Sequence, residues 1–130
     1  MSVRILVVDD EPDVAELFCQ HFRREARQGT YVLHFAYSGE EALEKLCTGI
    51  EPQLRVILSD INMPVMDGLE LLREIKTRRP DLPVMMVTTA YGDDERRRLA
   101  SQYGAAEFIT KPVDFDFLKT QLRDLSDAAD

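Results

Sequence analysis

The chain has 130 residues, of which 45% are hydrophobic and 31% are charged, and its formal net charge is −8. These values are typical of one globular domain with a hydrophobic core. The negative charge argues against direct nucleic-acid binding, because a polyanion needs a dense basic patch. No apolar stretch is long enough to cross a bilayer and no signal-peptide pattern precedes the first predicted strand, so we expect a cytoplasmic location without membrane attachment.

The predicted elements alternate between strands and helices. The continuous apolar run at residues 3–8 predicts a strand buried on both faces, and apolar residues at helical spacing follow it up to Phe22. Further strands are predicted at residues 31–36, 56–58, 83–88 and 108–110, and further helices at 38–46, 69–75, 95–103 and 115–125. Strict alternation predicts an α/β fold, a doubly wound (βα)5 unit with one parallel five-stranded sheet and helices on both faces. We expect one domain at residues 1–125 and a polar, frayed tail at 126–130.

The cysteines and histidines are interpreted as structural residues. Cys19 and Cys47 fall within helical apolar patterns, which predicts two buried thiols rather than a disulfide framework or a metal site. His21 and His34 lack partners at metal-binding or catalytic spacing.

Polar side chains gather immediately after four of the five predicted strands. In an open α/β sheet, ligands bind outside the carboxyl ends of the strands, near a topological switch point. We therefore expect the residues at these strand ends to converge on one site. They are Asp9, Asp10 and Glu11 after the first strand, Asp60 and Asn62 after the third, Thr88 and Thr89 after the fourth, and Lys111 and Pro112 after the fifth.

The residue types at these strand ends favour phosphoryl chemistry. Three carboxylates in one place repel each other, and a hard divalent cation such as Mg²⁺ or Mn²⁺ resolves this repulsion through oxygen ligands. A lysine and a hydroxyl beside such a cluster suit the oxygens of a phosphoryl group. A carboxylate can itself act as the nucleophile and form an aspartyl phosphate.

Three segments make the pattern specific. They are Val7-Val8-Asp9-Asp10-Glu11-Pro12, Leu58-Ser59-Asp60-Ile61-Asn62-Met63-Pro64-Val65-Met66-Asp67-Gly68 and Phe108-Ile109-Thr110-Lys111-Pro112. In their order and over essentially the whole chain, they resemble the receiver domains of bacterial two-component response regulators. The resemblance implies a flavodoxin-like (CheY-like) arrangement of the sheet.

The resemblance assigns roles to the acidic residues. Asp60 corresponds to the phosphoacceptor, which receives its group from a phosphohistidine of a sensor histidine kinase or a histidine phosphotransfer protein. Asp10, the carboxylate of Asp60 and the main-chain carbonyl of Asn62 correspond to direct Mg²⁺ ligands, and Asp9 corresponds to the residue that holds the waters of the metal.

The resemblance also assigns roles near the fifth strand. Lys111 corresponds to the lysine that pairs with the phosphoacceptor at rest and with the phosphoryl group afterwards, and its bond to Pro112 is typically cis in the family. Phe108 corresponds to the aromatic residue that turns inward on activation. The face formed by the fourth helix, the fifth strand and the fifth helix then carries the signal.

The site hydroxyl is either Thr88 or Thr89. This chain has one residue more between Pro83 and Lys111 than common family members, so counting from the two ends gives different threonines. An insertion inside a strand requires a bulge, whereas an insertion in the following loop costs little. This cost favours Thr88.

Two other polar segments are interpreted without a site role. Asp67-Gly68 indicates a turn and the start of a helix. The run Arg96-Arg97-Arg98 follows acidic residues and is typical of a solvated, ion-paired helix face, with a partner-recognition surface as the alternative.

We therefore expect a signalling switch that is catalytic only on itself and acts on an unknown target protein, with a possible phosphorylation-linked dimer. A phosphorelay intermediate and the N-terminal receiver of a longer regulator remain alternatives. A metal-dependent phosphohydrolase is a weaker one, because the haloacid dehalogenase type has an acid two residues after its nucleophile and Asn62 stands there in this chain.

Overall fold

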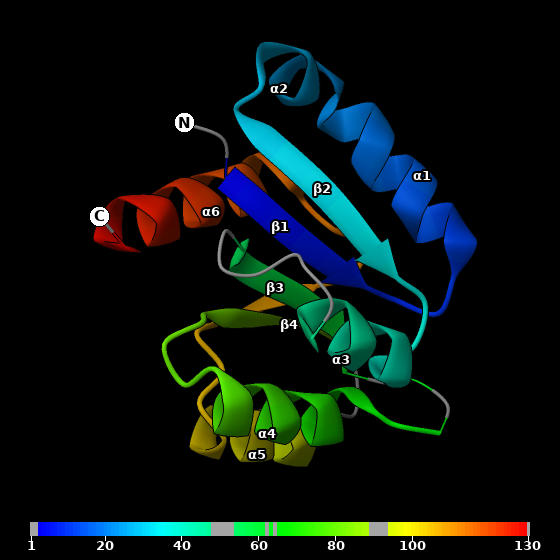
Figure 1. Ribbon diagram of the computed structural model, residues 1–130, viewed down its shortest axis with the longest axis vertical. Coiled ribbons are helices and arrows are strands. Elements are labelled where there is room, and N and C mark those ends of the chain that lie inside the picture. Colours follow the sequence, from blue (N-terminus) through cyan, green and yellow to red (C-terminus); the bar gives the residue numbers. More distant parts are fainter. Residues whose placement is uncertain (1–2, 48–53, 62, 64, 89–93, 130) are drawn as a thin grey trace.

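The computed structural model describes residues 3–47, 54–61, 63, 65–88 and 94–129. Five parallel strands form one sheet in the order β2-β1-β3-β4-β5 (Figure 1). The strands are β1 (Val3–Val8), β2 (Tyr31–Ala36), β3 (Leu54–Asp60), β4 (Val84–Thr88) and β5 (Glu107–Thr110). The helices are α1 (Pro12–His21), α2 (Arg23–Gln28), α3 (Gly39–Cys47), α4 (Gly68–Arg78), α5 (Asp94–Gln102) and α6 (Phe115–Ala129).

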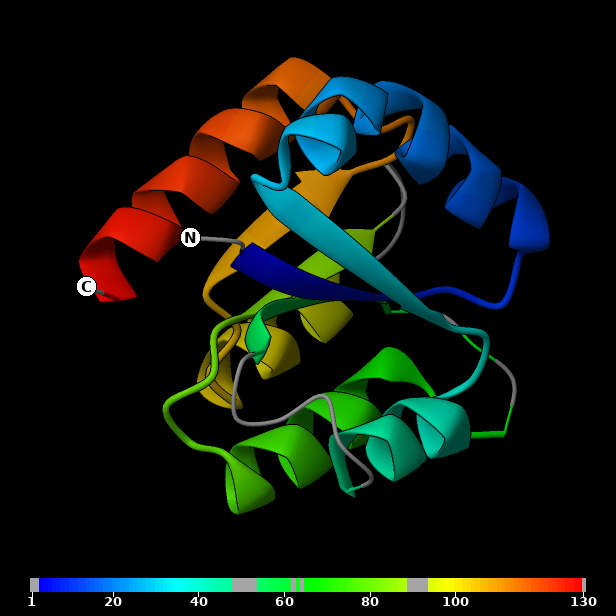
Figure 2. The same cartoon turned by 45° about the horizontal axis from the view of Figure 1, so that its top comes forward.

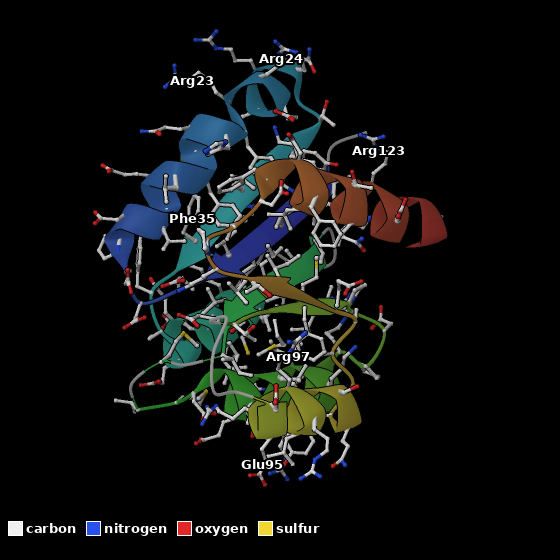
Figure 3. All side chains as sticks on the ribbon, turned by 180° about the vertical axis from the view of Figure 1, so that it is seen from behind. Arg23, Arg24, Phe35, Glu95, Arg97 and Arg123 are labelled. Carbon is white, nitrogen blue, oxygen red and sulfur yellow. The ribbon has the colours of Figure 1, made fainter. Side chains whose placement is uncertain are left out.

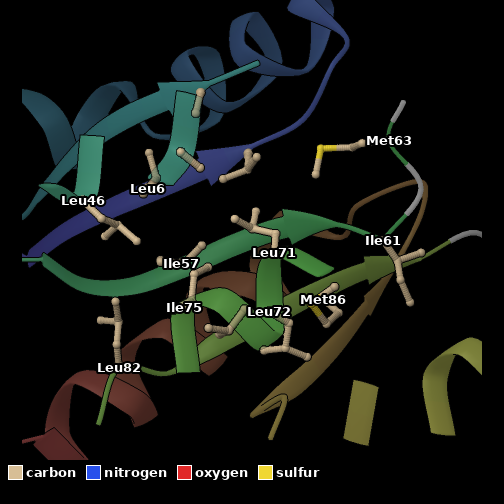
Figure 4. Packing of buried hydrophobic residues seen from close by; sticks show 14 of the residues in the cluster. Leu6, Leu46, Ile57, Ile61, Met63, Leu71, Leu72, Ile75, Leu82 and Met86 are labelled. Atoms are coloured by element: carbon tan, nitrogen blue, oxygen red, sulfur yellow. The ribbon is translucent and has the colours of Figure 1, made fainter. Parts of the chain in front are cut away.

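The helices cover both faces of the sheet. Helices α1, α2 and α6 lie on one face, and α3, α4 and α5 lie on the other (Figures 1 and 2). Successive residues of the inner strands alternate between two hydrophobic clusters, because side chains of a strand point to opposite faces. Ile57 and Met86 pack with Leu71 and Ile75 of α4 in one cluster (Figure 4). The predicted α/β class and parallel five-stranded sheet are therefore confirmed.

The strand order creates a switch point between β1 and β3. From β1 the chain passes to β2 on one side, and it then returns to place β3 on the other side. The connections from the carboxyl ends of β1 and β3 therefore diverge and leave an opening at that edge of the sheet. Asp9 and Asp10 follow β1, and Asp60 ends β3. The topology thus places the three residues around this opening.

One difference from the predicted elements is that a second helix, α2, which the sequence did not predict, follows the first helical segment. Helix α1 ends at His21 and α2 begins at Arg23, with Phe22 at φ −104° and ψ 14° between them. In a continuous helix the carbonyl of His21 would accept from the amide of Glu25. Instead Lys119 of α6 donates to this carbonyl at 2.7 Å. The break therefore coincides with a contact from a distant helix, which the local sequence pattern does not contain.

Two further predictions differ from the structure. Cys19 and Cys47 are both exposed, so the prediction of buried thiols is wrong. Their positions fall on the solvent side of α1 and α3, because the apolar stripes that face the sheet are occupied by larger side chains such as Phe18 and Leu46. Helix α6 also continues through residues 126–129, which the sequence assigned to a frayed tail. The division into a domain at residues 1–125 and a tail at 126–130 stays a prediction.

The start of α4 is packed directly against the end of β3. Asp67 caps the helix and accepts from the amide of Glu70 at 3.0 Å, as the prediction of a helix start requires. A Cβ atom built on Gly68 would lie 2.3 Å from the carbonyl oxygen of Asp60 and 2.6 Å from the Cα of Ile61. Only a residue without a side chain permits this approach of backbone to backbone.

The close approach at Gly68 yields a testable prediction. We expect Gly68→Ala to lower the free energy of unfolding by about 3 kcal/mol, because backbone atoms must shift to accept the methyl group. Gly39→Ala is the matched control, since the three atoms nearest to a Cβ there all belong to the flexible side chain of Met66, with Sδ at 2.7 Å. Urea unfolding of both variants measures the difference. Equal losses in the two variants would contradict the role assigned to Gly68.

A histidine on β2 yields a second prediction. Arg4 Nη1 lies 3.1 Å from His34 Nε2, and because arginine only donates, the imidazole nitrogen is the acceptor and the ring is neutral. Burial lowers the pKa of His34, and the charges of Arg4 and Lys45 lower it further. The unfolded chain therefore binds the proton more readily, and stability is lost as the pH falls below about 6.5, the ordinary value for histidine.

The variant His34→Gln removes this titration and keeps an acceptor. We expect the free energy of unfolding of the wild type to fall relative to that of the variant between pH 7.5 and pH 5.5. Chemical denaturation at both pH values checks this. A difference between the two proteins that does not change with pH would refute the assignment.

Candidate functional site

Three carboxylates meet at the opening between β1 and β3. One oxygen from each of Asp9, Asp10 and Asp60 lies within 4.8 Å of the others. Asp9 and Asp60 are buried, with 6% and 7% of their surface exposed, whereas Asp10 is exposed. Two negative groups at such a separation repel each other by roughly 3–4 kcal/mol at an effective dielectric constant near 20. The site therefore needs a positive charge.

Lys111 supplies the positive charge from the end of β5. Its Nζ atom lies 3.1 Å from Oδ2 of Asp60 and 3.3 Å from Oδ2 of Asp9. Burial alone would lower the pKa of Lys111, but the charges and hydrogen bonds of Asp60 and Asp9 together raise it above its ordinary value. Lysine is therefore an ammonium ion here. Three carboxylates and one ammonium still leave two net negative charges, which matches the charge of one divalent cation.

The backbone fixes the direction of the buried acids. The amide of Glu11 donates to Oδ1 of Asp9 at 3.0 Å, and the amide of Asp9 donates to the carbonyl of Ala36 at 3.1 Å. The first contact leaves Oδ2 of Asp9 for Lys111. The carboxylate is thus held by one main-chain and one side-chain donor before any ligand binds.

Thr88 ends β4 on the side of β5. Strand β4 pairs with β5, and Thr88 lies opposite Thr110. The carbonyl of Thr88 accepts from the amide of Lys111 at 2.8 Å. The side chain is 1% exposed, and its Oγ1 has no hydrogen-bond partner among the described residues. A buried hydroxyl without a partner costs free energy unless another state provides one. Thr89 and Asn62, the other predicted residues, lie outside the described residues.

The fifth strand carries the remaining predicted residues. The peptide bond between Lys111 and Pro112 is cis, as the family resemblance implied. Phe108 is partly buried, lies opposite Met86 of β4 and packs at the margin of the cluster under α4 and α5. The structure thus places Phe108 beside the strand that ends in Thr88. Its role as a switch stays a prediction.

The sequence did not identify Arg96 as a contact of this region. Arg96 Nη2 lies 3.0 Å from Oδ2 of Asp67 and donates to the carbonyl of Ile61 at 3.1 Å. The prediction of a solvated face is therefore wrong for Arg96, and it holds for Arg98, which pairs with the exposed Glu95 at 3.5 Å. Asp67 is 29 residues from Arg96, so helical spacing gives no signal of this pair.

A groove opens beside the carboxylates, between α1 and the connection from β5 to α6. Its volume is about 670 Å³. Asp9 and Lys111 are among the residues that line it. Most of its wall is apolar and comes from both segments, including Val14, Leu17, Phe18, Val113 and Phe115. The groove therefore joins an apolar surface to the charged site.

Comparison with known proteins decides the family. A model of the response regulator receiver domain matches residues 5–123. The chain belongs to this family. The transcriptional regulatory protein ZraR of Klebsiella oxytoca is 39% identical over 121 residues, which are 93% of this chain and 26% of ZraR. The response regulator MprA of Mycobacterium ulcerans is 36% identical over 126 residues, which are 96% of this chain and 50% of MprA.

Solved receiver structures agree with the fold. A response regulator receiver domain protein from Clostridium thermocellum has a TM-score of 0.86 and 27% identity, and the match covers 98% of this chain and 96% of that one. The response regulator TrrA from Thermotoga maritima, solved in complex with Mg²⁺–BeF, has a TM-score of 0.78 and 36% identity over 95% of this chain and 98% of TrrA. The chain is therefore a receiver of a two-component system, and phosphorylation and magnesium are expected from the family.

The chain corresponds to only part of its curated relatives. The chain spans between a quarter and a half of the length of these two curated relatives. The cluster of Asp9, Asp10 and Asp60 has the character of the acidic pocket at which receiver domains bind Mg²⁺. Among the helices that the structure describes, none combines the length and the apolar character needed to span a bilayer.

The position of Lys111 yields a testable prediction. Lys111→Met leaves the carboxylates without their cation, so we expect the free energy of unfolding without divalent ions to fall by about 1–3 kcal/mol, less than for a fully buried pair because the lysine is 26% exposed. Added Mg²⁺ should then stabilise the variant more than the wild type. Thermal unfolding with and without Mg²⁺ measures both effects.

Lys76→Met serves as the control for this experiment. Lys76 is also partly buried, but its Nζ donates to the carbonyl of Leu82 at 2.8 Å, and no aspartate of the cluster contacts it. We expect Mg²⁺ to stabilise this variant as it does the wild type. The assignment of Lys111 would be contradicted if Mg²⁺ stabilised Lys111→Met no more than the wild type.

Proposed function

We propose that this receiver accepts a phosphoryl group on Asp60 from a phosphohistidine of a sensor histidine kinase or a histidine phosphotransfer protein. The observation that carries the proposal is the contact of Lys111 with Asp60 and Asp9 inside a cluster of three carboxylates. A carboxylate that contacts a lysine ammonium group at the switch point of the sheet is accessible to a ligand from the carboxyl edge. The cluster also has the excess charge that a divalent cation neutralises.

The transfer is a substitution at phosphorus. A carboxylate oxygen of Asp60 attacks the phosphorus atom, the new O–P bond forms, and the P–N bond to the donor histidine breaks. The electron pair of that bond stays on the imidazole nitrogen. Charge spreads over the equatorial oxygens in the transition state, so fixed positive groups and donors accelerate the reaction.

The residues at the site take separate parts in this reaction. Lys111 would exchange Asp60 for a phosphoryl oxygen, and the hydroxyl of Thr88, which has no partner among the described residues, would donate to another. The carboxylates of Asp10 and Asp60 and the main-chain carbonyl of Asn62 would hold Mg²⁺ or Mn²⁺ directly, and Asp9 would hold its waters. The cation would neutralise the charge that develops on the phosphoryl oxygens.

The groove beside the site suits the docking of the phosphodonor. A donor histidine must bring its phosphoryl group to Asp60, so the donor has to contact the surface around the opening. Leu17 is a large apolar residue with 46% of its surface exposed, and it lies on the α1 wall of the groove. Burial of such a surface provides affinity without a specific charge pattern.

The output face would be formed by α5, β5 and α6. These elements are the predicted fourth helix, fifth strand and fifth helix, because α2 was not among the predicted helices. Phosphorylation adds roughly two negative charges. Reorientation of Thr88 and Lys111 towards them would free space for Phe108 and bias the packing of this face. Contact with an unknown target protein, and a possible phosphorylation-linked dimer, would follow from the changed face.

Two alternatives describe the protein in which this receiver acts. ZraR and MprA are named as regulators and are longer than this chain, which supports a receiver that is part of a longer regulator as one alternative. A phosphorelay intermediate is the other. In each case we propose a cytoplasmic protein that is not an enzyme on external substrates and catalyses only its own phosphorylation and dephosphorylation.

Intact mass tests the acceptor. After incubation with acetyl phosphate and Mg²⁺, we expect the wild type to gain one phosphoryl group, and Asp60→Asn to gain none because an amide oxygen is a poor nucleophile. Asp81→Asn is the control, since Asp81 is exposed in the connection before β4 and contacts Arg79 rather than the site. It should gain the group like the wild type.

The contrary outcomes are distinct. A phosphoryl group that survives in Asp60→Asn would remove Asp60 from its role. The absence of a gain in the wild type, with Mg²⁺ binding intact, would point to a receiver that is not phosphorylated by small donors. Steady turnover of a phosphate ester, which does not phosphorylate a receiver, would favour a phosphohydrolase.

A further inference from the structure

Arg96 of α5 holds both ends of the connection between β3 and α4. Its Nη2 donates to the carbonyl of Ile61 at 3.1 Å, and the same atom lies 3.0 Å from Oδ2 of Asp67. Ile61 directly follows Asp60, and Asp67 caps α4. One side chain from a distant helix therefore joins the residue after the phosphoacceptor to the start of the next helix.

The ion pair of Arg96 with Asp67 is partly buried, and one donor of the guanidinium lacks an acceptor among the described residues. The side chains of Arg96 and Asp67 are 33% and 29% exposed, so solvent screens the pair less than it screens an ion pair on the open surface. The Nε atom of Arg96 is buried and has no partner among the described residues. A buried donor without an acceptor favours any rearrangement that supplies one. The guanidinium of Arg96 can therefore move to a new acceptor when a negative charge is added nearby.

The next residue of α5 contacts the other predicted switch element. The guanidinium of Arg97 lies 5.0 Å from the ring centroid of Phe108, within cation–π range. Figure 3 shows Arg97 on the side of α5 that faces the sheet and Glu95 on the side that faces away. Two consecutive arginines therefore connect α5 to the loop after Asp60 and to the aromatic ring of β5.

We propose that Arg96 is a positioning residue that couples α5 to the loop following Asp60, so that a phosphoryl group on Asp60 changes α5 through this side chain. The inference rests on the proposed function, because it takes Asp60 as the phosphoacceptor. New negative charge at Asp60 lies one residue from the carbonyl that Arg96 binds. It competes with Asp67 for the guanidinium, since charged acceptors are the preferred partners of arginine.

The consequences follow from the attachment of α5. When the guanidinium of Arg96 moves from Asp67 towards the phosphoryl group, the first turn of α5 moves with it. The contact of Arg97 with Phe108 then changes, because both arginines belong to the same helix. The signal reaches α5 by a side chain that crosses from helix to loop. A purely structural ion pair would stabilise the loop without making α5 respond to the site.

Hydrogen–deuterium exchange of the peptide that covers α5 tests the coupling. The proteins are the wild type, Arg96→Met, Asp67→Asn and the double variant. Asparagine keeps the helix cap and removes only the charge. Arg98→Met is the matched control, because Arg98 lies in the same helix and pairs with the exposed Glu95 of that helix. Each protein is measured alone and with Mg²⁺ and beryllofluoride, an analogue of the phosphoryl group.

We expect Mg²⁺ and beryllofluoride to change exchange in α5 of the wild type and of Arg98→Met. In Arg96→Met, exchange without the analogue should be roughly fivefold faster, as expected for the loss of one charge-assisted contact, and the analogue should leave it unchanged. Asp67→Asn should show the same direction. The double variant should differ little from Arg96→Met, because both changes remove one interaction.

Two results would overturn the inference. An equal response of α5 in the wild type and in Arg96→Met would show that the signal does not pass through this side chain. Additive effects of Arg96→Met and Asp67→Asn would show that the two residues act separately. If the wild type neither responds to the analogue nor gains a phosphoryl group from acetyl phosphate, the proposed function itself fails and the inference falls with it.

Discussion

The repulsion among three carboxylates at one edge of the sheet is the constraint around which this receiver is built. Asp9, Asp10 and Asp60 lie within a few ångströms of each other only because β1 and β3 are neighbours in a parallel sheet. Water would normally screen such charges, but Asp9 and Asp60 are buried. Lys111 offsets part of the repulsion from the far side of β4. The site is therefore stable enough to fold and still attracts a cation.

The hydrophobic core makes this arrangement possible. Both faces of the inner strands are covered by helices, and the alternating side chains fill two dense clusters. A close-packed interior resists displacement, so the strand ends stay in place although the groups they carry repel each other. At Gly68 the packing extends to the backbone, where α4 begins directly against the last residues of β3. The scaffold thus fixes the position of Asp60 from both sides.

In the proposed switch, arginine contacts beside the site provide a route for its signal. Arginine side chains of α5 contact the loop after Asp60 and the ring of Phe108, and neither contact is fully enclosed. Partly exposed, charge-dependent contacts change more readily than apolar packing when a charge is added nearby. In the proposed switch, phosphorylation would therefore displace the helix that carries Arg96 and Arg97.

The sequence by itself determined the strands, most helices, the parallel sheet and the convergence of the three aspartates with Lys111. Apolar runs such as residues 3–8 predict buried strands from local pattern alone, and the polar residues after them converge because all parallel strands end at one edge. Tertiary structure alone decided the break at Phe22, the exposure of Cys19 and the pairing of Arg96 with Asp67. Each depends on a side chain brought from a distant segment or on which stripe of a helix meets the sheet. Periodicity reports the partners of a residue within its own helix or strand, and it contains no information on partners that only the folded chain brings near.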